Sequence, residues 1–371
     1  MRRHALSRRT GWTTAACAAT LLLTGAPATA DVPARTLHTI DLSVPGTDGS
    51  VSDINRRGLM VGSFQDADGE SRAVLWARPD SPKILGDGLG PPSALNERGD
   101  VVGGDWLWRR GTVRHLSDPA GHETAAFVNN RGQVAGSRED EEGRSTAFRW
   151  QDGRFTDIGT PAGWYSWATG LNDRGDVIGL LKNADFTVHQ GFIWHDGVLT
   201  VIDAKGFDTE PAAVNERGEV VGRAGFPGSS SAYHPFRWAH GTVTDLMPGR
   251  PDEHGAAHDI NDAGDVVGHV ANRAALWRDG RTVLIGPGGP EYGGVAEAVN
   301  ERGDVAGRLG RATSDEDRRV WAFRWRAGTV LLTEPLTGEA GLAVAGIDDQ
   351  GQLAGTIHDG LGDSRAVIWR P

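Results

Sequence analysis

The chain has 371 residues, with 53 glycines, 13 tryptophans, three lysines and a formal net charge of −11. Glycine destabilises long helices, so this composition favours strands and turns. An acidic chain that is almost free of lysine is poorly suited to nucleic acid, whose binding depends on neutralising phosphates.

Residues 1–30 are typical of a secretory signal peptide. Arginines precede an apolar stretch, and the small residues at 28–30 form a cleavage site. An arginine pair at 8–9 leaves two export routes open, the general secretory (Sec) route and twin-arginine export. We therefore expect a secreted, extracellular protein. Its mature chain, residues 31–371, has no cysteine, because Cys17 lies in the signal peptide. The mature chain also has no apolar run of about 18 residues that could span a membrane.

One motif recurs along the mature chain, namely apolar-Asn-x-x-Gly-x-apolar-x-Gly, with copies spaced 33 to 48 residues apart. Such self-similarity is the signature of a repeat architecture. Asn caps its own backbone at the start of a turn, and Gly three residues later takes the left-handed conformation that closes a bulged hairpin. The motif therefore predicts eight hairpin turns, which begin at Asn55, Asn96, Asn129, Asn172, Asn215, Asn261, Asn300 and Asp348.

Three copies of this turn motif contain Arg-Gly-Asp, a tripeptide known from cell adhesion, at residues 98–100, 174–176 and 302–304. The turn chemistry explains the copies with the tripeptide and those without it equally well. We therefore interpret the tripeptide as a by-product of the turn and expect no role for it in adhesion.

A second motif, small-[Phe/Val/Leu]-x-Trp, follows each turn motif. Seven of the eight tryptophans in this motif are followed by a third short segment, of which residues 152–159 are an example. Asp-Gly between two apolar runs indicates a further hairpin. One unit is then four short antiparallel strands, the size of a β-propeller blade. We expect the repeat tryptophans to be buried between blades; they are Trp76, Trp108, Trp150, Trp194, Trp238, Trp277, Trp325 and Trp369.

The two ends of the chain complement each other. The last tryptophan strand, residues 365–369, has no hairpin partner, whereas an extra strand at 36–42 precedes the first turn motif. A ring closed by the N-terminal strand leaves no exposed edge. We therefore predict an all-β fold, a single propeller over residues 31–371 with eight four-stranded blades of about 42 residues. Seven blades are the alternative, because the second unit has almost no loop between Gly103 and Trp108.

Together, the motifs Asn-x-x-Gly-x-Val-x-Gly, His-Ala-Phe-x-Trp and x-Gly-x-x-x-Asp-Leu resemble those of the extracellular HAF-repeat family of bacterial exported proteins. The nearest matches to the second motif are residues 234–238, 146–150 and 321–325. The resemblance covers nearly the whole mature chain and implies export and a repeat architecture, but no settled activity. Histidine occupies the first position of that motif only at His234, which argues against a metal array built on it.

The expected strand order places the two short turns of every blade on one face of the ring and the variable loops on the other. Function is more often carried by variable loops. On that face we expect a loop with Trp164, Tyr165 and Trp167, which lie outside the repeat position and suit sugar stacking or a protein contact. Packing over a blade edge is the alternative. Asp53, expected near the central axis, is a further candidate for ligand binding.

His258, Asp259 and Glu297 are expected on or beside innermost strands, near the central channel. A pair of carboxylates there could perform general acid–base catalysis, although a solvated channel lining explains them as well. No nucleophile elbow, phosphate loop or zinc helix is present in the sequence.

Three acidic loops resemble calcium sites but lack the full alternating set of oxygen ligands; they span residues 66–71, 138–143 and 314–319. Acidic hairpin tips explain these loops equally well. We therefore expect no metal and no other cofactor, with calcium as the alternative.

The uniform repeats favour a secreted, non-catalytic binding or interaction module, because no blade is set aside for chemistry. We expect it to act as a monomer and to bind a polysaccharide or an extracellular protein. Two alternatives stay open. One is a carbohydrate-active propeller enzyme, a hydrolase or lyase that uses carboxylates near the channel, and the other is a structural component of the cell envelope.

Overall fold

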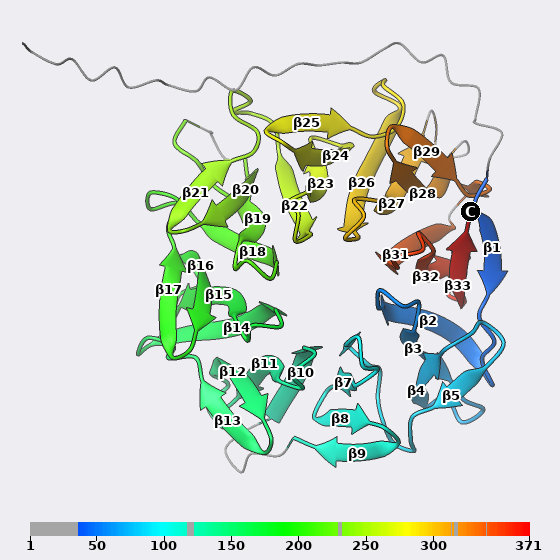
Figure 1. Cartoon of the computed structure of the whole chain (residues 1–371), viewed down its shortest axis with the longest axis horizontal. Coiled ribbons are helices and arrows are strands. Elements are labelled where there is room, and N and C mark those ends of the chain that lie inside the picture. The colour runs from blue at the N-terminus through cyan, green and yellow to red at the C-terminus, as the bar shows by residue number, and fades with distance from the viewer. Residues whose placement is uncertain (1–35, 117–121, 229–231, 313, 315–317, 339) are drawn as a thin grey trace, which may run out of the picture.

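The computed structural model describes residues 36–371, except 117–121, 229–231, 313, 315–317 and 339 (Figure 1). Every element within this described part is a β-strand, and the strands form eight sheets arranged in a ring. The signal peptide expected at 1–30 lies outside the described residues. The described part also includes no helix long and apolar enough to cross a membrane.

Each sheet is an antiparallel blade whose strands follow one another from the central axis outward (Figure 1). Blades 1 to 3 consist of β2 (Thr47–Ile54), β3 (Met60–Gln65), β4 (Ser71–Trp76) and β5 (Pro82–Ile84); β6 (Ala94–Leu95), β7 (Val101–Gly103), β8 (Trp106–Arg109) and β9 (Thr112–His115); and β10 (His122–Val128), β11 (Val134–Glu139), β12 (Ser145–Gln151) and β13 (Arg154–Asp157). Blades 4 to 6 consist of β14 (Trp164–Leu171), β15 (Val177–Asn183), β16 (His189–His195) and β17 (Val198–Ile202); β18 (Thr209–Val214), β19 (Val220–Ala224), β20 (His234–Ala239) and β21 (Thr242–Asp245); and β22 (Gly255–Ile260), β23 (Val266–Val270), β24 (Arg273–Arg278) and β25 (Arg281–Leu284). Blades 7 and 8 consist of β26 (Tyr292–Val299), β27 (Val305–Arg311), β28 (Arg319–Arg326), β29 (Thr329–Leu332) and β30 (Leu336–Thr337); and β31 (Gly341–Ile347), β32 (Leu353–His358), β33 (Ser364–Arg370) and β1 (His38–Asp41).

The eighth blade is closed by the two ends of the described chain. Strand β1 pairs antiparallel with β33, with His38 opposite Arg370 and Asp41 opposite Val367. This confirms the predicted closure by the N-terminal strand. The eight-bladed prediction is confirmed as well, because the short second unit still forms a complete sheet of four strands.

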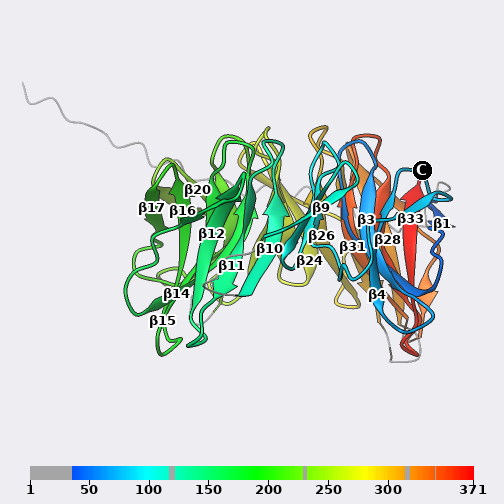
Figure 2. The same ribbon diagram turned by 90° about the horizontal axis from the view of Figure 1, so that it is seen from below.

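The turn chemistry follows the sequence motifs. Asn55 Oδ1 accepts the amide N–H groups of Arg57 and Leu59, each at 3.0 Å, and Gly58 adopts a φ of 81°. In the hairpin between β12 and β13 of blade 3, Asp152 and Gly153 both have positive φ, as the tight two-residue turn requires. Figure 2 shows the blades edge-on, with strands running between the two faces of the ring. We call the face with the Asn turns, such as residues 55–58, the turn face and the opposite one the loop face.

The hydrophobic core is divided among the interfaces between blades. Trp194 of blade 4 is 2% exposed and packs in one cluster with Ala135, Ala147 and Ile158 of blade 3. Seven of the eight repeat tryptophans are buried and Trp238 is half-buried. Each of these eight indoles belongs to a hydrophobic cluster that combines residues of two neighbouring blades.

Candidate functional site

The Asn of each turn motif also links neighbouring blades. Its side-chain Nδ2 donates to the backbone carbonyl of the corresponding Asn, or of Asp348, in the next motif, at 2.8 to 3.1 Å. The seven links run from Asn55 to Asn96, Asn129, Asn172, Asn215, Asn261, Asn300 and Asp348 in turn. Only the local turn could be predicted for this residue from the sequence, because the second bond joins residues more than 30 positions apart.

The aspartates of the three Arg-Gly-Asp tripeptides are buried. Asp100, Asp176 and Asp304 are 4%, 1% and 1% exposed. Asp176 accepts a hydrogen bond from the motif Asn at 2.8 Å and contacts His195, and Asp304 pairs with Arg324 at 2.9 Å. These carboxylates hold the turn to the tryptophan strand of the same blade and are not available to an adhesion receptor.

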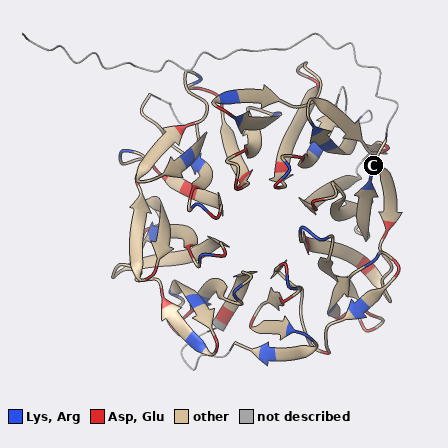
Figure 3. Ribbon diagram, viewed as in Figure 1, with Lys and Arg blue, Asp and Glu red and all other residues tan. Residues whose placement is uncertain are grey.

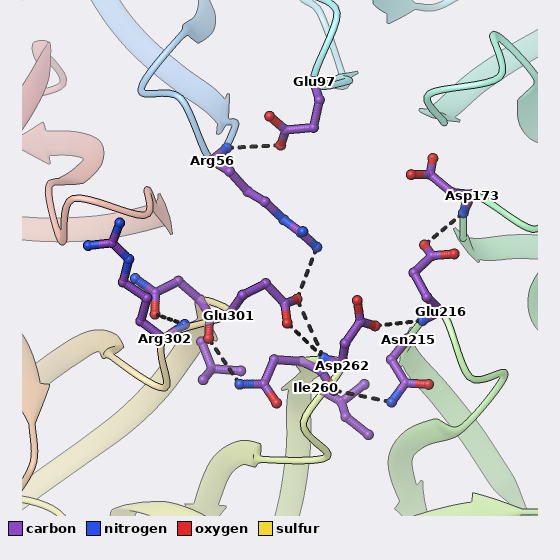
Figure 4. A network of polar contacts seen from close by, with 12 residues as sticks. Arg56, Glu97, Asp173, Asn215, Glu216, Ile260, Asp262, Glu301 and Arg302 are labelled. Carbon is purple, nitrogen blue, oxygen red and sulfur yellow. Dashed lines mark hydrogen bonds and ion pairs between the residues drawn. The ribbon is translucent and has the colours of Figure 1, made fainter.

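A belt of carboxylates surrounds the axis on the turn face (Figure 4). Each one accepts the amide N–H of the corresponding residue in the preceding blade, and Arg56 reaches Glu301 at 2.9 Å. Burial raises the pKa of Glu216 and of Glu301. The belt consists of Glu97, Asp173, Glu216, Asp262 and Glu301.

Asp53 and Asp259, two of the predicted site residues, bridge neighbouring blades. One carboxylate oxygen of each accepts the amide N–H of the following residue at 2.8 Å. The other accepts an amide N–H from the next blade, that of Leu95 for Asp53 and that of Val299 for Asp259, both at 2.9 Å. Burial raises the pKa of Asp53 to about 6 and also raises that of Asp259. Both oxygens of each carboxylate thus accept hydrogen bonds from backbone amides, and these bonds link neighbouring blades.

His258 and Glu297, the other two acid–base candidates, occupy equivalent β-bulges in the innermost strands of blades 6 and 7. His258 Nε2 lies 3.0 Å from Nδ1 of His269, with the rings stacked at 5.2 Å. Burial and then the neighbouring His269 lower the pKa of His258 to about 4. This histidine is therefore neutral over most of the pH range.

Glu297 lies 3.4 Å from Arg308, and its second oxygen, Oε2, is buried without a hydrogen-bond partner in the described part of the chain. Burial raises the pKa of this carboxyl. His269 and Arg308 were not predicted as site residues, although both directly follow the last Gly of a turn motif. Their shared position directly after the motif could have identified these two residues in the sequence.

Trp164, Tyr165 and Trp167 lie in β14, the innermost strand of blade 4, and not in a loop as expected. The strand begins at Trp164 because its backbone already pairs with Asn183 of β15. Alternation along the strand separates the three rings. Trp164 packs against the cluster shared with blade 3, and Tyr165 and Trp167 lie on the opposite face of the strand.

Tyr165 and Trp167 form an aromatic cluster with Phe186, which follows β15. The rings of Tyr165 and Trp167 are stacked, with centroids 6.0 Å apart and an interplanar angle of 12°. Phe186 is 5.1 Å from Tyr165 and 50% exposed. Lys182 Nζ lies 5.7 Å from the ring of Trp167. Phe186 and Lys182 were not predicted from the sequence, because they join the cluster only through the pairing of β15 with β14.

The acidic loops use their first aspartate for their own turn. Asp66 and Asp140 each accept the amide N–H groups two and four residues later and pair with Arg72 and Arg144. The third such loop lies partly outside the described residues. Among the residues that are described, no group of three His, Cys, Asp or Glu could hold a metal ion. The expectation that no cofactor is needed stays a prediction.

No known protein-family model matches this chain, and no curated protein matches it in sequence. Among solved structures, it is similar to prolyl endopeptidases at 10% identity, with a TM-score of 0.50 over 87% of this chain and 54% of theirs. A puromycin-hydrolyzing peptidase of Mycobacterium tuberculosis gives 13% identity and a TM-score of 0.50 over 88% of this chain and 61% of that one. This chain therefore spans little more than half the length of these two enzymes, and the likeness shows the propeller fold alone.

Proposed function

We propose that this chain is a secreted, non-catalytic binding module of the HAF-repeat type that binds carbohydrate on the loop face of blade 4. The observation that supports this function is the aromatic cluster formed by the half-buried Tyr165 and Trp167 with the exposed Phe186. Aromatic rings present flat apolar faces to sugar rings, and they are enriched where binding energy concentrates.

The cluster is held in place by the scaffold, which reduces the entropy lost on binding. Tyr165 and Trp167 project from a strand paired along its length with β15. Phe186 adopts a φ of 56°, a left-handed conformation that costs roughly 1–2 kcal/mol for a residue with a side chain. Its backbone N–H bonds to Asn183 at 2.9 Å, which fixes this turn.

A second candidate function is a glycan-cleaving enzyme, a hydrolase or lyase. The observation that favours it is the Glu297 carboxyl, which is partly buried, has one unpartnered oxygen and has a raised pKa. A carboxyl in such a setting suits a general acid. Asp259 is not available as its partner, because both of its oxygens are bound to backbone amides.

Binding can be tested with residues 31–371 and insoluble plant and cell-wall polysaccharides. We expect the variant Tyr165→Ala/Trp167→Ala to lose retention by about tenfold or more, because each stacked ring contributes on the order of 1 kcal/mol. Phe207→Ala is the matched control, since Phe207 is 39% exposed and lies outside the stacked cluster. Equal retention of all three proteins would contradict the proposal.

The same polysaccharide-binding assay distinguishes this binding module from a glycan-cleaving enzyme and from a structural component of the envelope. An enzyme would release soluble sugar, and Glu297→Gln would abolish this release while retaining binding. A structural component of the envelope would bind none of these polysaccharides.

A further inference from the structure

Four of the repeat tryptophans have a cationic side chain from the preceding blade over the indole ring. A cation in this position is attracted by the electron-rich face of the ring. The pairs are Lys83–Trp108, Arg114–Trp150, Arg149–Trp194 and Arg278–Trp325, with the cation 4.6, 4.8, 4.5 and 5.8 Å from the ring centroid. Covering the indole with a positive charge is thus a recurrent feature of the interfaces between blades.

Three positions within a blade supply these cations. Lys83 and Arg114 lie in the outermost strand, opposite the residue that precedes the tryptophan of their own blade. Arg149 directly precedes the tryptophan of its own blade, and Arg278 directly follows its own. We call these three the covering positions.

Blade 4 alone among the eight described blades has neither lysine nor arginine at any covering position. Its residues there are Ile193 before Trp194, His195 after it, and Thr200 opposite Ile193. In the next blade, Trp238 is half-buried, whereas the other seven repeat tryptophans are buried. The one repeat tryptophan that stays partly exposed is therefore the one whose preceding blade offers no covering lysine or arginine.

A cavity of about 520 Å³ opens beside Trp238, on the turn face between blades 4 and 5. Thr200, Ile193 and Val198 line it from blade 4, and Val198 is 65% exposed. Cavities of this size hold small ligands or single side chains. The cavity thus connects the indole of Trp238 with the covering positions that carry a cation in the other blades.

The two arginines that line the cavity are already paired. Arg174 lies 3.4 Å from Asp176, and Arg217 lies 2.8 Å from Glu219. His195 also contacts Asp176, through Nδ1. The charges of these two ion pairs cancel, so neither arginine adds uncompensated positive charge to the cavity.

Asp196 is the third carboxylate that lines the cavity. Its side chain is 75% exposed, and its ion-pair partners Arg149 and His195 lie at 3.9 and 3.7 Å, beyond hydrogen-bonding distance. With the histidines counted as neutral, two arginines and three carboxylates give the described lining a formal charge of −1. Figure 3 shows basic and acidic residues spread around the whole ring, so no large region of one sign counteracts this local charge. A cation is therefore attracted to the cavity at Asp196.

We propose that this cavity binds the guanidinium group of an arginine, which stacks on Trp238 and pairs with Asp196. The ligand thereby takes the place that Arg149 has over Trp194 in the preceding interface. Guanidinium is favoured over ammonium because it is planar, weakly hydrated and stacks well on aromatic rings. The site lies on the turn face, apart from the aromatic cluster on the loop face, so it does not depend on the proposed binding of carbohydrate.

The experiment titrates residues 31–371 with Nα-acetyl-arginine amide and with Nα-acetyl-citrulline amide in a calorimeter. Citrulline has the shape of arginine, but its urea group is neutral. We expect arginine to bind at least about tenfold more tightly, because citrulline lacks both the cation–π attraction and the ion pair. Free arginine and the peptide Gly-Gly-Arg-Gly-Gly then identify the source of the group. Tighter binding of the peptide indicates an arginine within a polypeptide, and tighter binding of free arginine indicates the amino acid itself.

The decisive variant is Thr200→Arg, which restores in blade 4 the cation that Arg114 supplies in blade 2. It should abolish binding of the ligand and raise the melting temperature, because the new side chain fills the site from within. Thr244→Arg is the matched control, since Thr244 is exposed like Thr200 and occupies the same position one blade later, opposite Arg237. This control should bind arginine as the wild type does.

Asp196→Asn tests the ion pair without adding a side chain. It should weaken binding of arginine about threefold, as expected for one exposed ion pair, and should leave the affinity for citrulline unchanged. Asparagine tolerates the positive φ of 42° at this position, so the turn is retained. Equal affinities for arginine and citrulline, binding of neither, or equal losses in Thr200→Arg and Thr244→Arg would overturn the proposal.

Discussion

At the residue scale, the motif Asn combines two hydrogen-bonding functions that Asp cannot combine. Its Oδ1 closes the turn and its Nδ2 donates to the next blade, as in Asn300, which bonds to the Asp348 carbonyl at 2.8 Å. Asp348 accepts the turn amides of Gln350 and Gln352, each at 2.8 Å, but has no hydrogen to donate to blade 1. Burial raises the pKa of this carboxyl.

The substitution Asp348→Asn should therefore increase the free energy of unfolding by about 1 kcal/mol at pH 7, the net value of one added hydrogen bond. Blade 3 already contains the resulting combination, in which Asn129 Nδ2 donates to Gln133 Oε1 at 2.7 Å. Chemical denaturation measures the change. The converse substitution Asn261→Asp is the control and should destabilise the protein.

The increase in unfolding free energy that Asp348→Asn produces should also depend on pH. A carboxyl whose folded pKa is raised stabilises the protein fully below its unfolded pKa, and this contribution is lost as pH rises through the folded pKa. The wild type therefore recovers stability in acid, near and below the ordinary aspartate pKa of 3.8, whereas the variant does not titrate there. The difference in unfolding free energy should shrink as pH falls from 7 towards 4. A constant difference would show that the Asp348 carboxyl is not perturbed.

At the element scale, the innermost strand of each blade packs against the preceding blade, and the side chain of the repeat tryptophan fills part of the same interface. Trp194 of β16 packs against Ala135 and Ala147, and the Arg149 guanidinium lies 4.5 Å from the indole ring. Trp238 occupies the same motif position in β20 but is only half-buried. Burial therefore differs between two blades that share the same motif.

Replacing these two tryptophans tests this difference. Trp194→Ala should lower the unfolding free energy by about 3–5 kcal/mol, because a large side chain leaves a cavity in a packed interface. Trp238→Ala should cost clearly less, since less of its surface is removed from water on folding. Thermal and chemical unfolding compare the two variants. Equal losses would show that the interfaces do not depend on the burial of this ring.

The fold could be predicted from the sequence because the turn chemistry is local. Asn-x-x-Gly and Asp-Gly define hairpins within a few residues, and repetition of these hairpins defines blades. The site was less predictable because it is not local. Trp164, Tyr165 and Trp167 were placed in a loop, since nothing in the sequence shows that β14 extends this far. Residues such as His269 and Arg308 join the site only through packing between blades.

At the scale of the whole molecule, ring closure depends on one short strand from the far end of the chain. Besides the pairing of β1 with β33, the Leu37 amide N–H donates to the Leu332 carbonyl at 2.8 Å, and the Leu42 amide N–H donates to the Ala366 carbonyl at 2.9 Å. Leu37 is also fully buried, in the cluster that joins blades 7 and 8. The N-terminal segment thus covers an edge and fills part of a core.

A truncated chain that begins at Leu42 should therefore be strongly destabilised. It loses Leu37, whose burial contributes about 2–5 kcal/mol, and exposes the edge of β33, which can pair with a second copy. We expect a lower melting temperature and concentration-dependent association in light scattering. A synthetic peptide of residues 36–41 should restore the melting temperature and the monomer, and a scrambled peptide of the same composition should not. If the truncated chain stayed monomeric with an unchanged melting temperature, the ring would not need its closing strand, and blade-to-blade contacts alone would hold the propeller together.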